Sequence, residues 1–272
     1  QALAFCPRRD LLATGTHQVQ VWDISKEIPA LAGSFDHPDR VEGLAFSPDG
    51  RMLAGAGYDT LQVFSSVEES MLESRLVYHR VARRWQHAVA WSPDGGQLAL
   101  GHDDGVTLFE QVRGEWQPRD QLQGGQVISV AYSPDGKLAA GCQDTHHVLV
   151  WDLSGRKPIA LESLTGHADA AVGVVFSPDG GWLATASRDG TWRVKSLSKK
   201  NPHTYGLNLG VAVRSAAFSP DGGSLAAVGA NQSVIIWDLA TASVRQTLTG
   251  HPAQPTAVAY TPDAQWLAVG CE

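Results

Sequence analysis

Residues 173–196 read GVVFSPDGGWLATASRDGTWRVKS, and this stretch contains the pattern that decides the fold. An alternating run ends in Phe176, and Pro-Asp-Gly follows it as a strong turn signal. A second apolar run, WLATAS, and a third, WRVK, are separated by Asp189 and a glycine. Each run has the length and residue types of a β-strand, so the stretch predicts three antiparallel strands joined by tight turns.

The same phrase, an aromatic and a small residue before Pro-Asp-Gly, recurs along the chain. Five copies begin at Phe46, Trp91, Tyr132, Phe176 and Phe218, and two looser copies begin at Phe5 and Tyr260. Successive aromatic residues are 41, 45, 41, 44, 42 and 42 positions apart. A looser fourth segment closes each unit, and four short strands in about 42 residues are typical of a β-propeller blade. The sequence therefore predicts one all-β domain of seven repeats over residues 1–272.

Two further dipeptides occur at fixed places in these units. Trp-Asp ends the third strand at residues 22–23, 151–152 and 237–238, and Gly-His or Asp-His precedes the first strand at His37, His167 and His251. Each of these histidines lies nine residues before the next aromatic. The chain resembles WD-repeat β-propellers over essentially its whole length, in the regular FSPDG form of prokaryotic arrays. The resemblance implies a seven-bladed β-propeller of four-stranded antiparallel blades, with the seventh blade incomplete.

The resemblance also implies structural roles for particular side chains. In the family, a histidine, a serine or threonine, an aspartate and a tryptophan form a hydrogen-bonded set within a blade. The fifth unit matches this set at His167, Ser187 and Asp189, but Lys195 occupies the tryptophan position. The tryptophans of the Trp-Asp pairs are expected to be structural as well: Trp22, Trp151 and Trp237.

Two stretches depart from the repeat. Residues 65–86 are irregular and charged, and we expect them to bulge or to fold back as a loop. The chain begins on the first strand of one unit and stops after the second strand of the seventh. We therefore expect it to be a segment of a longer multidomain protein.

Composition excludes several classes of protein. The net charge of −7 argues against nucleic acid as a partner, and no apolar run approaches the length that would span a membrane. Cys6, Cys142 and Cys271 lie far apart, which supports neither a disulfide framework nor a zinc site. This cysteine usage is typical of a reducing compartment, so we expect the protein to be cytoplasmic.

No enzymatic motif emerges. The chain contains neither GxSxG nor GxxxxGK[ST], and the aspartates of the Pro-Asp-Gly turns recur one per unit, too far apart to share a metal. His146 and His147 are adjacent, so on a strand they would point to opposite faces. We therefore expect no catalytic residue, no metal and no cofactor.

A partner would dock, by resemblance to the family, on the loops before the first strands and the turns after the second strands. The candidate partner-binding residues there are Arg40, Glu42, Tyr58, Arg84, Gln86, Asp103, Arg188 and Arg214. Their arginines would form a basic rim on an acidic protein, and the alternative is a solvated rim of scattered charge. Trp85, Trp116 and Trp192 lie off the repeat pattern, as contact anchors or as packing between blades.

These observations favour a non-catalytic protein–protein interaction scaffold or sensor domain that binds a protein or peptide on the propeller face. The prokaryotic arrays that the chain resembles are joined to an effector domain, an NTPase, kinase or protease, outside the propeller. Two alternatives stay open: a propeller enzyme with a metal or cofactor in its channel, and a constitutive structural assembly module.

Overall fold

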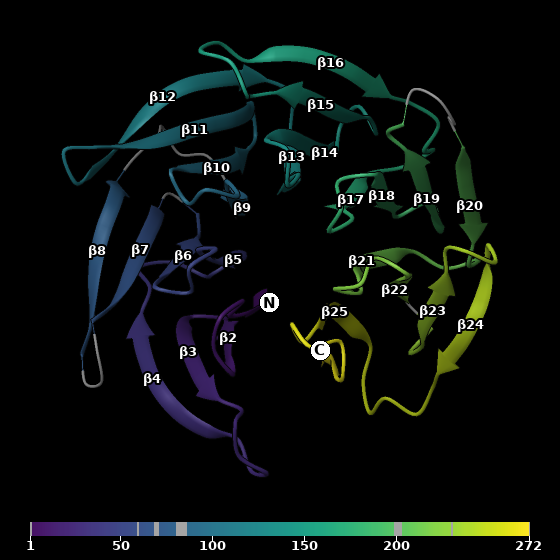
Figure 1. The fold of residues 1–272 in the computed structure, drawn as a ribbon, viewed down its shortest axis with the longest axis horizontal. Helices are drawn as coiled ribbons and strands as arrows, with labels where there is room; N and C mark the ends of the chain where they lie inside the picture. Colours follow the sequence, from purple (N-terminus) through teal and green to yellow (C-terminus); the bar gives the residue numbers. More distant parts are fainter. Residues whose placement is uncertain are drawn as a thin grey trace. The chain divides into compact units, whose positions relative to one another are not determined.

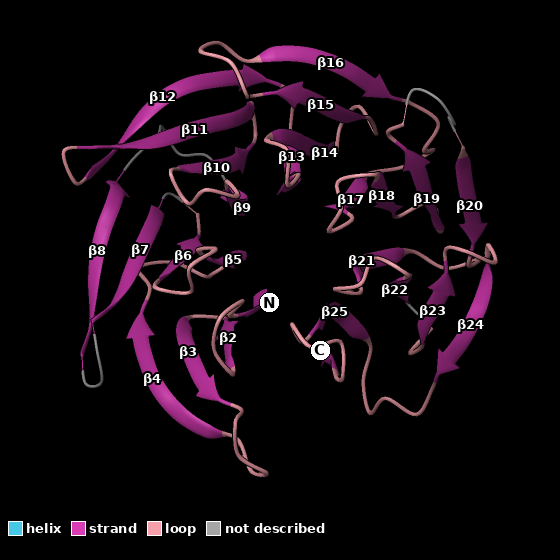
Figure 2. Ribbon diagram, viewed as in Figure 1, coloured by secondary structure: helices cyan, strands magenta, loops and turns pink. Residues whose placement is uncertain are grey.

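The computed structural model describes residues 2–58, 60–67, 71–79, 86–198, 203–229 and 231–271. In these residues the regular structure is β throughout, with 26 strands in seven antiparallel sheets (Figure 2). Six sheets have four strands and the last has two. The sheets are the blades of a seven-bladed β-propeller with a small last blade, as the repeats predict. The chain divides into two compact units, Gln1–Gln123 and Gly124–Glu272.

The first unit holds three blades, each with its strands paired in chain order. Their strands are β1 (Ala2–Phe5), β2 (Leu11–Gly15), β3 (Gln18–Asp23) and β4 (Ala30–Asp36); β5 (Gly43–Phe46), β6 (Met52–Ala56), β7 (Thr60–Val67) and β8 (Met71–His79); and β9 (Gln86–Trp91), β10 (Gln97–His102), β11 (Gly105–Val112) and β12 (Glu115–Gln123).

The second unit holds the other four blades, again paired in chain order. Their strands are β13 (Val127–Tyr132), β14 (Lys137–Cys142), β15 (Val148–Asp152) and β16 (Ile159–Leu164); β17 (Ala171–Phe176), β18 (Trp182–Ser187), β19 (Thr191–Ser196) and β20 (Thr204–Asn208); β21 (Val213–Phe218), β22 (Ser224–Gly229), β23 (Val234–Asp238) and β24 (Ser243–Leu248); and β25 (Pro255–Tyr260) with β26 (Leu267–Cys271). The first strands of these blades, β13, β17, β21 and β25, are neighbours in succession (Figure 1).

The Ser-Pro-Asp-Gly turns fix where the first strand of a blade ends and the second begins. In the second blade, the Ser47 hydroxyl donates to Oδ1 of Asp49 at 2.6 Å and accepts the backbone N–H of Met52 at 2.9 Å. Gly50 closes the turn at a φ of 69°, a left-handed conformation that glycine adopts without steric cost. The hydrogen bond from Ser47 lowers the pKa of Asp49, so the carboxylate remains an acceptor at neutral pH. The repeated phrase is therefore a self-contained turn.

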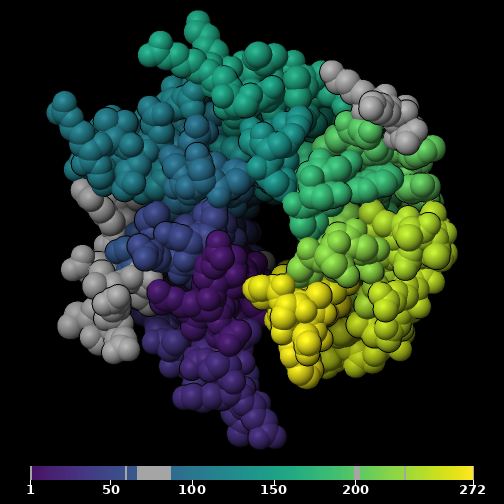
Figure 3. All heavy atoms as spheres, in the orientation of Figure 1, coloured from purple at the N-terminus to yellow at the C-terminus, as the bar shows by residue number. Residues whose placement is uncertain are grey.

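The second strands form the most buried layer of the blades, which explains their small residues. Every residue of β22 is buried, and alanines supply much of the surface that neighbouring sheets contact. Between the fifth and sixth blades, Trp192 is fully buried and meets Trp237 edge to face, with ring centroids 5.0 Å apart. Within the second unit, side chains fill the space between successive sheets (Figure 3).

The stretch 65–86 and the off-pattern tryptophans both depart from the repeat, and the structure places most of them. Much of the irregular stretch 65–86 is strand, because β8 pairs with β7 as the fourth strand of the second blade. Residues 68–70 and 80–85 of that stretch lie outside the described residues. Of the off-pattern tryptophans, Trp192 is core packing, Trp116 lies edge to face against Trp91 at 5.3 Å, and Trp85 is outside the described residues.

Candidate interaction face

In each of several blades, the loop before the first strand lies against the turn after the second strand. The backbone N–H of Gln143 donates to the carbonyl of Gln126 at 2.8 Å, and Arg188 does the same to Ala170 at 3.1 Å. In the second blade, the backbone N–H of Glu42 donates to the carbonyl of Ala56 at 2.8 Å. These bonds bring the two predicted docking loops of a blade together at one end of its sheet.

The candidate residues of the first unit are held by neighbouring charges. Nε of Arg40 lies 3.2 Å from Oε1 of Glu42, and the arginine side chain remains 59% exposed. Oδ1 of Asp103 lies 3.2 Å from Nε2 of His87. Tyr58, after β6, is half-buried. The loops of this unit therefore present one pair of opposite charges, Arg40 with Glu42, and a hydrogen-bonded pair, His87 with Asp103.

The candidate residues of the second unit differ in exposure. Arg188 is exposed in the turn after β18, whereas Arg214 on β21 donates from Nη2 to Oε1 of Gln254 at 2.8 Å. Arg84 lies outside the described residues, and Gln86 is placed only as the first residue of β9. The predicted convergence of four arginines stays a prediction.

The set of polar residues in the fifth blade is built around His167. Nε2 of His167 lies 2.8 Å from Oγ1 of Thr185, and Nδ1 lies 3.0 Å from Oγ1 of Thr191 and 3.4 Å from Oδ2 of Asp189. The sequence predicts Ser187 as the hydroxyl partner, but its side chain donates instead to the carbonyl of Asp169 at 3.0 Å. The network therefore consists of His167, Thr185, Thr191 and Asp189.

Burial and hydrogen bonding set the charges of this network. Burial lowers the pKa of His167, and the attraction of Asp189 offsets this only in part. Although burial raises the pKa of Asp189, hydrogen bonds from Thr191 and the backbone N–H of Ala168 hold it at about 2. At neutral pH the network is a neutral imidazole beside a carboxylate, which is a structural arrangement.

The tryptophans of the Trp-Asp pairs have different surroundings. Nε1 of Trp22 donates to Oγ1 of Thr14 at 3.2 Å. Thr14 occupies the register position in the first blade that Thr185 occupies in the fifth. In the sixth blade that position is Ala227, and the buried Nε1 of Trp237 has no acceptor. Trp151 is buried at the equivalent place in the fourth blade.

Sequence reasoning missed Thr185. It placed His37 before a first strand but did not give its partner, the carbonyl of Asp39, which lies 2.9 Å from Nδ1 of the buried histidine. The position of Thr185 in the repeat could have indicated its role. Thr185 follows the Pro-Asp-Gly turn of its blade at the same distance at which Thr14 follows the degenerate turn of the first blade.

The described part of the chain offers no cluster of metal ligands and, at Cys142, a buried, protonated thiol. No group of three or more histidine, cysteine, aspartate or glutamate side chains lies close enough there to hold a metal ion. Burial raises the pKa of Cys142 to about 11, so its thiol stays protonated and donates to the carbonyl of Gly124 at 3.0 Å. No helix in the same residues has the length and apolar character needed to cross a membrane.

Comparison with known proteins decides the family. The sequence model of the WD domain, G-beta repeat, matches residues 30–64, 116–152, 159–194, 202–238 and 242–272, which is more than half of the chain. The chain belongs to the WD-repeat family. The five matched segments contain two of the three Trp-Asp pairs, at residues 151–152 and 237–238, and they leave residues 65–115 unmatched.

Several curated WD-repeat relatives resemble this chain. It is 32% identical over 169 residues to WD repeat-containing protein SL1-17 of Schistosoma mansoni, covering 61% of this chain and 55% of that protein. It is 26% identical over 171 residues to the target of rapamycin complex subunit LST8 of Mus musculus, covering 62% and 52%. It is 26% identical over 280 residues to protein hir1 of Schizosaccharomyces pombe, covering 87% and 30%. The chain spans less than two thirds of the length of these relatives.

Proposed function

We propose that this WD-repeat protein is a non-catalytic scaffold or sensor domain that binds a protein or peptide partner on the loop face. That face consists of the loops before the first strands and the turns after the second strands. The observation that carries the proposal is their pairing within a blade: backbone hydrogen bonds such as that from Arg188 to Ala170 hold the two loops together at one end of a sheet. Loops held together on a sheet in this way form a surface that suits recognition.

The relatives support a protein as the partner. The mouse relative is, by its name, a subunit of a target of rapamycin complex, so that protein works within an assembly. Exposed arginines such as Arg40 and Arg188 suit acidic groups on a partner, because a guanidinium binds carboxylates bidentately. A cytoplasmic location and a linked effector domain, an NTPase, kinase or protease, remain part of the same proposal.

The test is affinity capture with the 272-residue chain, followed by binding measurements on the purified partner. The rim variant changes Arg40, Arg84, Arg188 and Arg214 to glutamate. The matched control makes the same charge change away from the loop face, at Lys26, Arg156, Lys157 and Arg245. We expect the rim variant alone to lose the partner.

Two results would contradict the proposal. Equal retention by both variants places the site elsewhere on the chain. If both variants keep the partner at high salt and the free chain forms constitutive oligomers, the assembly-module alternative is favoured.

A further inference from the structure

The fifth blade carries a cavity with charged and apolar lining residues where the first, fourth and sixth blades have a tryptophan. Lys195 on β19 pairs with Leu183 in the register in which Trp22 pairs with Leu12. Beside it lies a cavity of about 310 Å³, bounded by β16 of the fourth blade and by β18, β19 and β20 of the fifth. Its apolar floor consists of Val148, Leu164 and Leu183.

Two cationic side chains line this cavity. The guanidinium of Arg193 donates from Nη2 to the carbonyl of Gly166 at 2.5 Å, which fixes it at the rim of the cavity. Gly166 has a φ of 114°, and a Cβ there would lie 2.4 Å from Nη1 of Arg193, so the guanidinium would have to move. The absence of a Cβ at position 166 therefore makes room for Arg193.

Among the side chains that line the cavity, positive charge exceeds negative charge by one at neutral pH, and the ionised Asp189, 3.4 Å from Nδ1 of His167, is not one of them. Lys195 forms an ion pair with Glu162, which neutralises one of the two cations. His167 lines the cavity with a pKa lowered by burial and is therefore uncharged. Arg193 has no ion-pair partner among the described residues, so its charge is available to a ligand.

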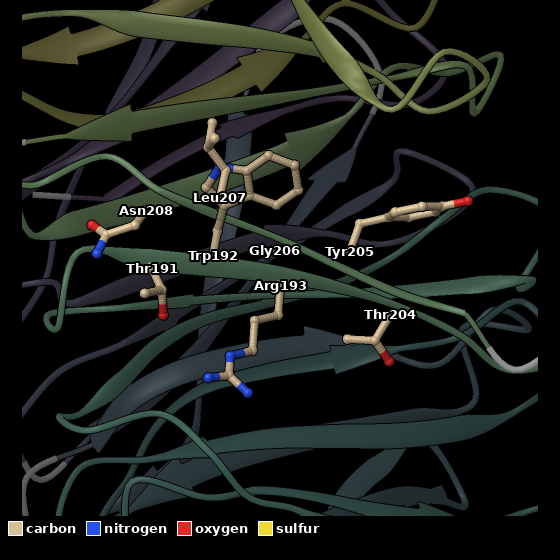
Figure 4. A pocket seen from close by; sticks show the side chains of 8 residues that line it. All are labelled: Thr191, Trp192, Arg193, Thr204, Tyr205, Gly206, Leu207 and Asn208. Atoms are coloured by element: carbon tan, nitrogen blue, oxygen red, sulfur yellow. The ribbon is translucent and has the colours of Figure 1, made fainter.

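Hydroxyl groups complete the lining. Thr165 and Thr204 border the cavity and are exposed to solvent. Figure 4 shows that Arg193 and Thr204 project to one side of the β19–β20 pair, whereas Trp192 projects to the other, into the core. One guanidinium and two hydroxyls suit a group with several acceptor oxygens, and a phosphate monoester has three, whereas the Lys195 ammonium is shared with Glu162.

We propose that this cavity binds a phosphorylated serine or threonine side chain of a partner protein. A peptide is favoured over a membrane because the chain has a net charge of −7, which repels anionic lipid surfaces. A peptide is favoured over free phosphate because β16, at the edge of the cavity, is an edge strand that can pair with an extended segment. On that strand Ile159 and Leu161 are 59% and 49% exposed and offer apolar contacts.

The test is isothermal titration calorimetry at fixed ionic strength and pH 7.5 with the whole chain. The probe is acetyl-Ala-Ala-phosphoserine-Ala-Ala-amide, and the comparison ligands are its unphosphorylated form and inorganic phosphate. We expect one site per chain for the phosphopeptide, no binding of the unphosphorylated form, and binding of inorganic phosphate about tenfold weaker than that of the phosphopeptide.

Two variants probe the cavity in different ways. Arg193→Gln installs the residue of the first blade, Gln20, and removes the charge. Lys195→Trp installs the tryptophan of the first, fourth and sixth blades and fills the space. Each should weaken phosphopeptide binding by about tenfold or more, while the exposed control Arg245→Gln leaves it unchanged. Circular dichroism and thermal unfolding verify that each variant is folded.

Several results would overturn this proposal. Retained affinity in both folded variants, or no phosphopeptide binding by the unaltered chain, excludes the cavity as the site. Inorganic phosphate that binds as tightly as the phosphopeptide excludes a peptide source. Co-sedimentation with phosphatidylserine vesicles that Arg193→Gln abolishes assigns the cavity to a membrane instead. None of these experiments alters the loop face, so their failure is distinct from failure of the scaffold function.

Discussion

The indole N–H of Trp22 donates to Oγ1 of Thr14 over 3.2 Å, across two neighbouring strands of the first blade. The equivalent pair in the sixth blade is Trp237 and Ala227, where the indole N–H is buried without an acceptor. A buried donor without a partner costs about 1–3 kcal/mol. The sixth blade therefore lacks an acceptor for a buried indole N–H, and the first blade shows that a hydroxyl at the register position of Ala227 can supply one.

Ala227→Ser is expected to stabilise the protein by about 1 kcal/mol, because the new hydroxyl can accept from Trp237. Urea denaturation followed by tryptophan fluorescence measures the free energy of unfolding. The control is Ala226→Ser, one residue earlier and on the opposite face of β22. The core cluster around Ala226 contains no tryptophan, so a hydroxyl there has no indole N–H to accept. Equal destabilisation by both serines would show that packing, not the orphan N–H, dominates.

The His167 network predicts how stability depends on pH. The pKa of Asp189 falls from an ordinary value of 3.8 to about 2 in the folded protein. The folded state therefore binds fewer protons, and the stabilisation is complete above about pH 4 and disappears as the pH approaches 2. His167 acts in the same direction at higher pH: its pKa is lowered, so unfolding becomes easier as the pH falls through 6.5.

Asp189→Asn is accordingly expected to cost about 1–2 kcal/mol at pH 7 and almost nothing at pH 2. The amide oxygen can still accept from Thr191, but the amide N–H₂ would face the backbone N–H of Ala168. Free energies of unfolding at several pH values between 2 and 8 provide the measurement. A penalty that is constant over this range would mean that geometry rather than charge explains it.

The turn phrase predicted the strands well because it is local. Phe176 ends β17 and β18 begins at Trp182, as the Pro-Asp-Gly turn between them requires. Side-chain partners were harder to predict, because they depend on register. The β17–β18 pairing shifts between Ala171 and Gly173, and Ser187 reaches the carbonyl of Asp169 while Thr185 meets His167.

The cavity beside Arg193 shows a different limit of sequence reasoning. Lys195 is recognisable from the sequence as a departure from the tryptophan pattern. The cavity that results is also bounded by the fourth blade, which the sequence pattern of the fifth does not reveal. The ion pair joins Lys195 to Glu162, 33 residues earlier, and no local pattern predicts that distance in space. The loop-face residues meet the same limit, because complementarity is a property of two surfaces.

The hydroxyl of the turn phrase should be essential to each turn. Ser177 is buried, donates to Oδ1 of Asp179 at 2.5 Å and accepts the backbone N–H of Trp182 at 2.9 Å. Ser177→Ala is expected to cost about 1–3 kcal/mol, because the N–H of Trp182 loses its acceptor. The same variant should raise the pKa of Asp179, which the serine hydrogen bond lowers. Carboxyl NMR titration checks the second effect, and an unchanged pKa would contradict the assignment of its cause.

The seventh copy of the turn phrase contains a backbone strain that a single substitution can relieve. Ala264 has a φ of 59°, in the position where five other copies have glycine in the same conformation. A residue with a Cβ pays about 1–2 kcal/mol in the left-handed region. Ala264→Gly is therefore expected to stabilise the β25–β26 hairpin by about 1 kcal/mol, after the entropy cost of glycine is subtracted.

The reciprocal control is Gly222→Ala in the sixth blade, where φ is 72° and the nearest atom to a new Cβ, Cδ of Pro178, lies at an ordinary 3.7 Å. That control should destabilise by a similar amount for backbone reasons alone, and hydrogen exchange at β26 separates local from global effects. Opposite signs for the two substitutions support the strain, whereas two losses would mean that the seventh turn does not need glycine.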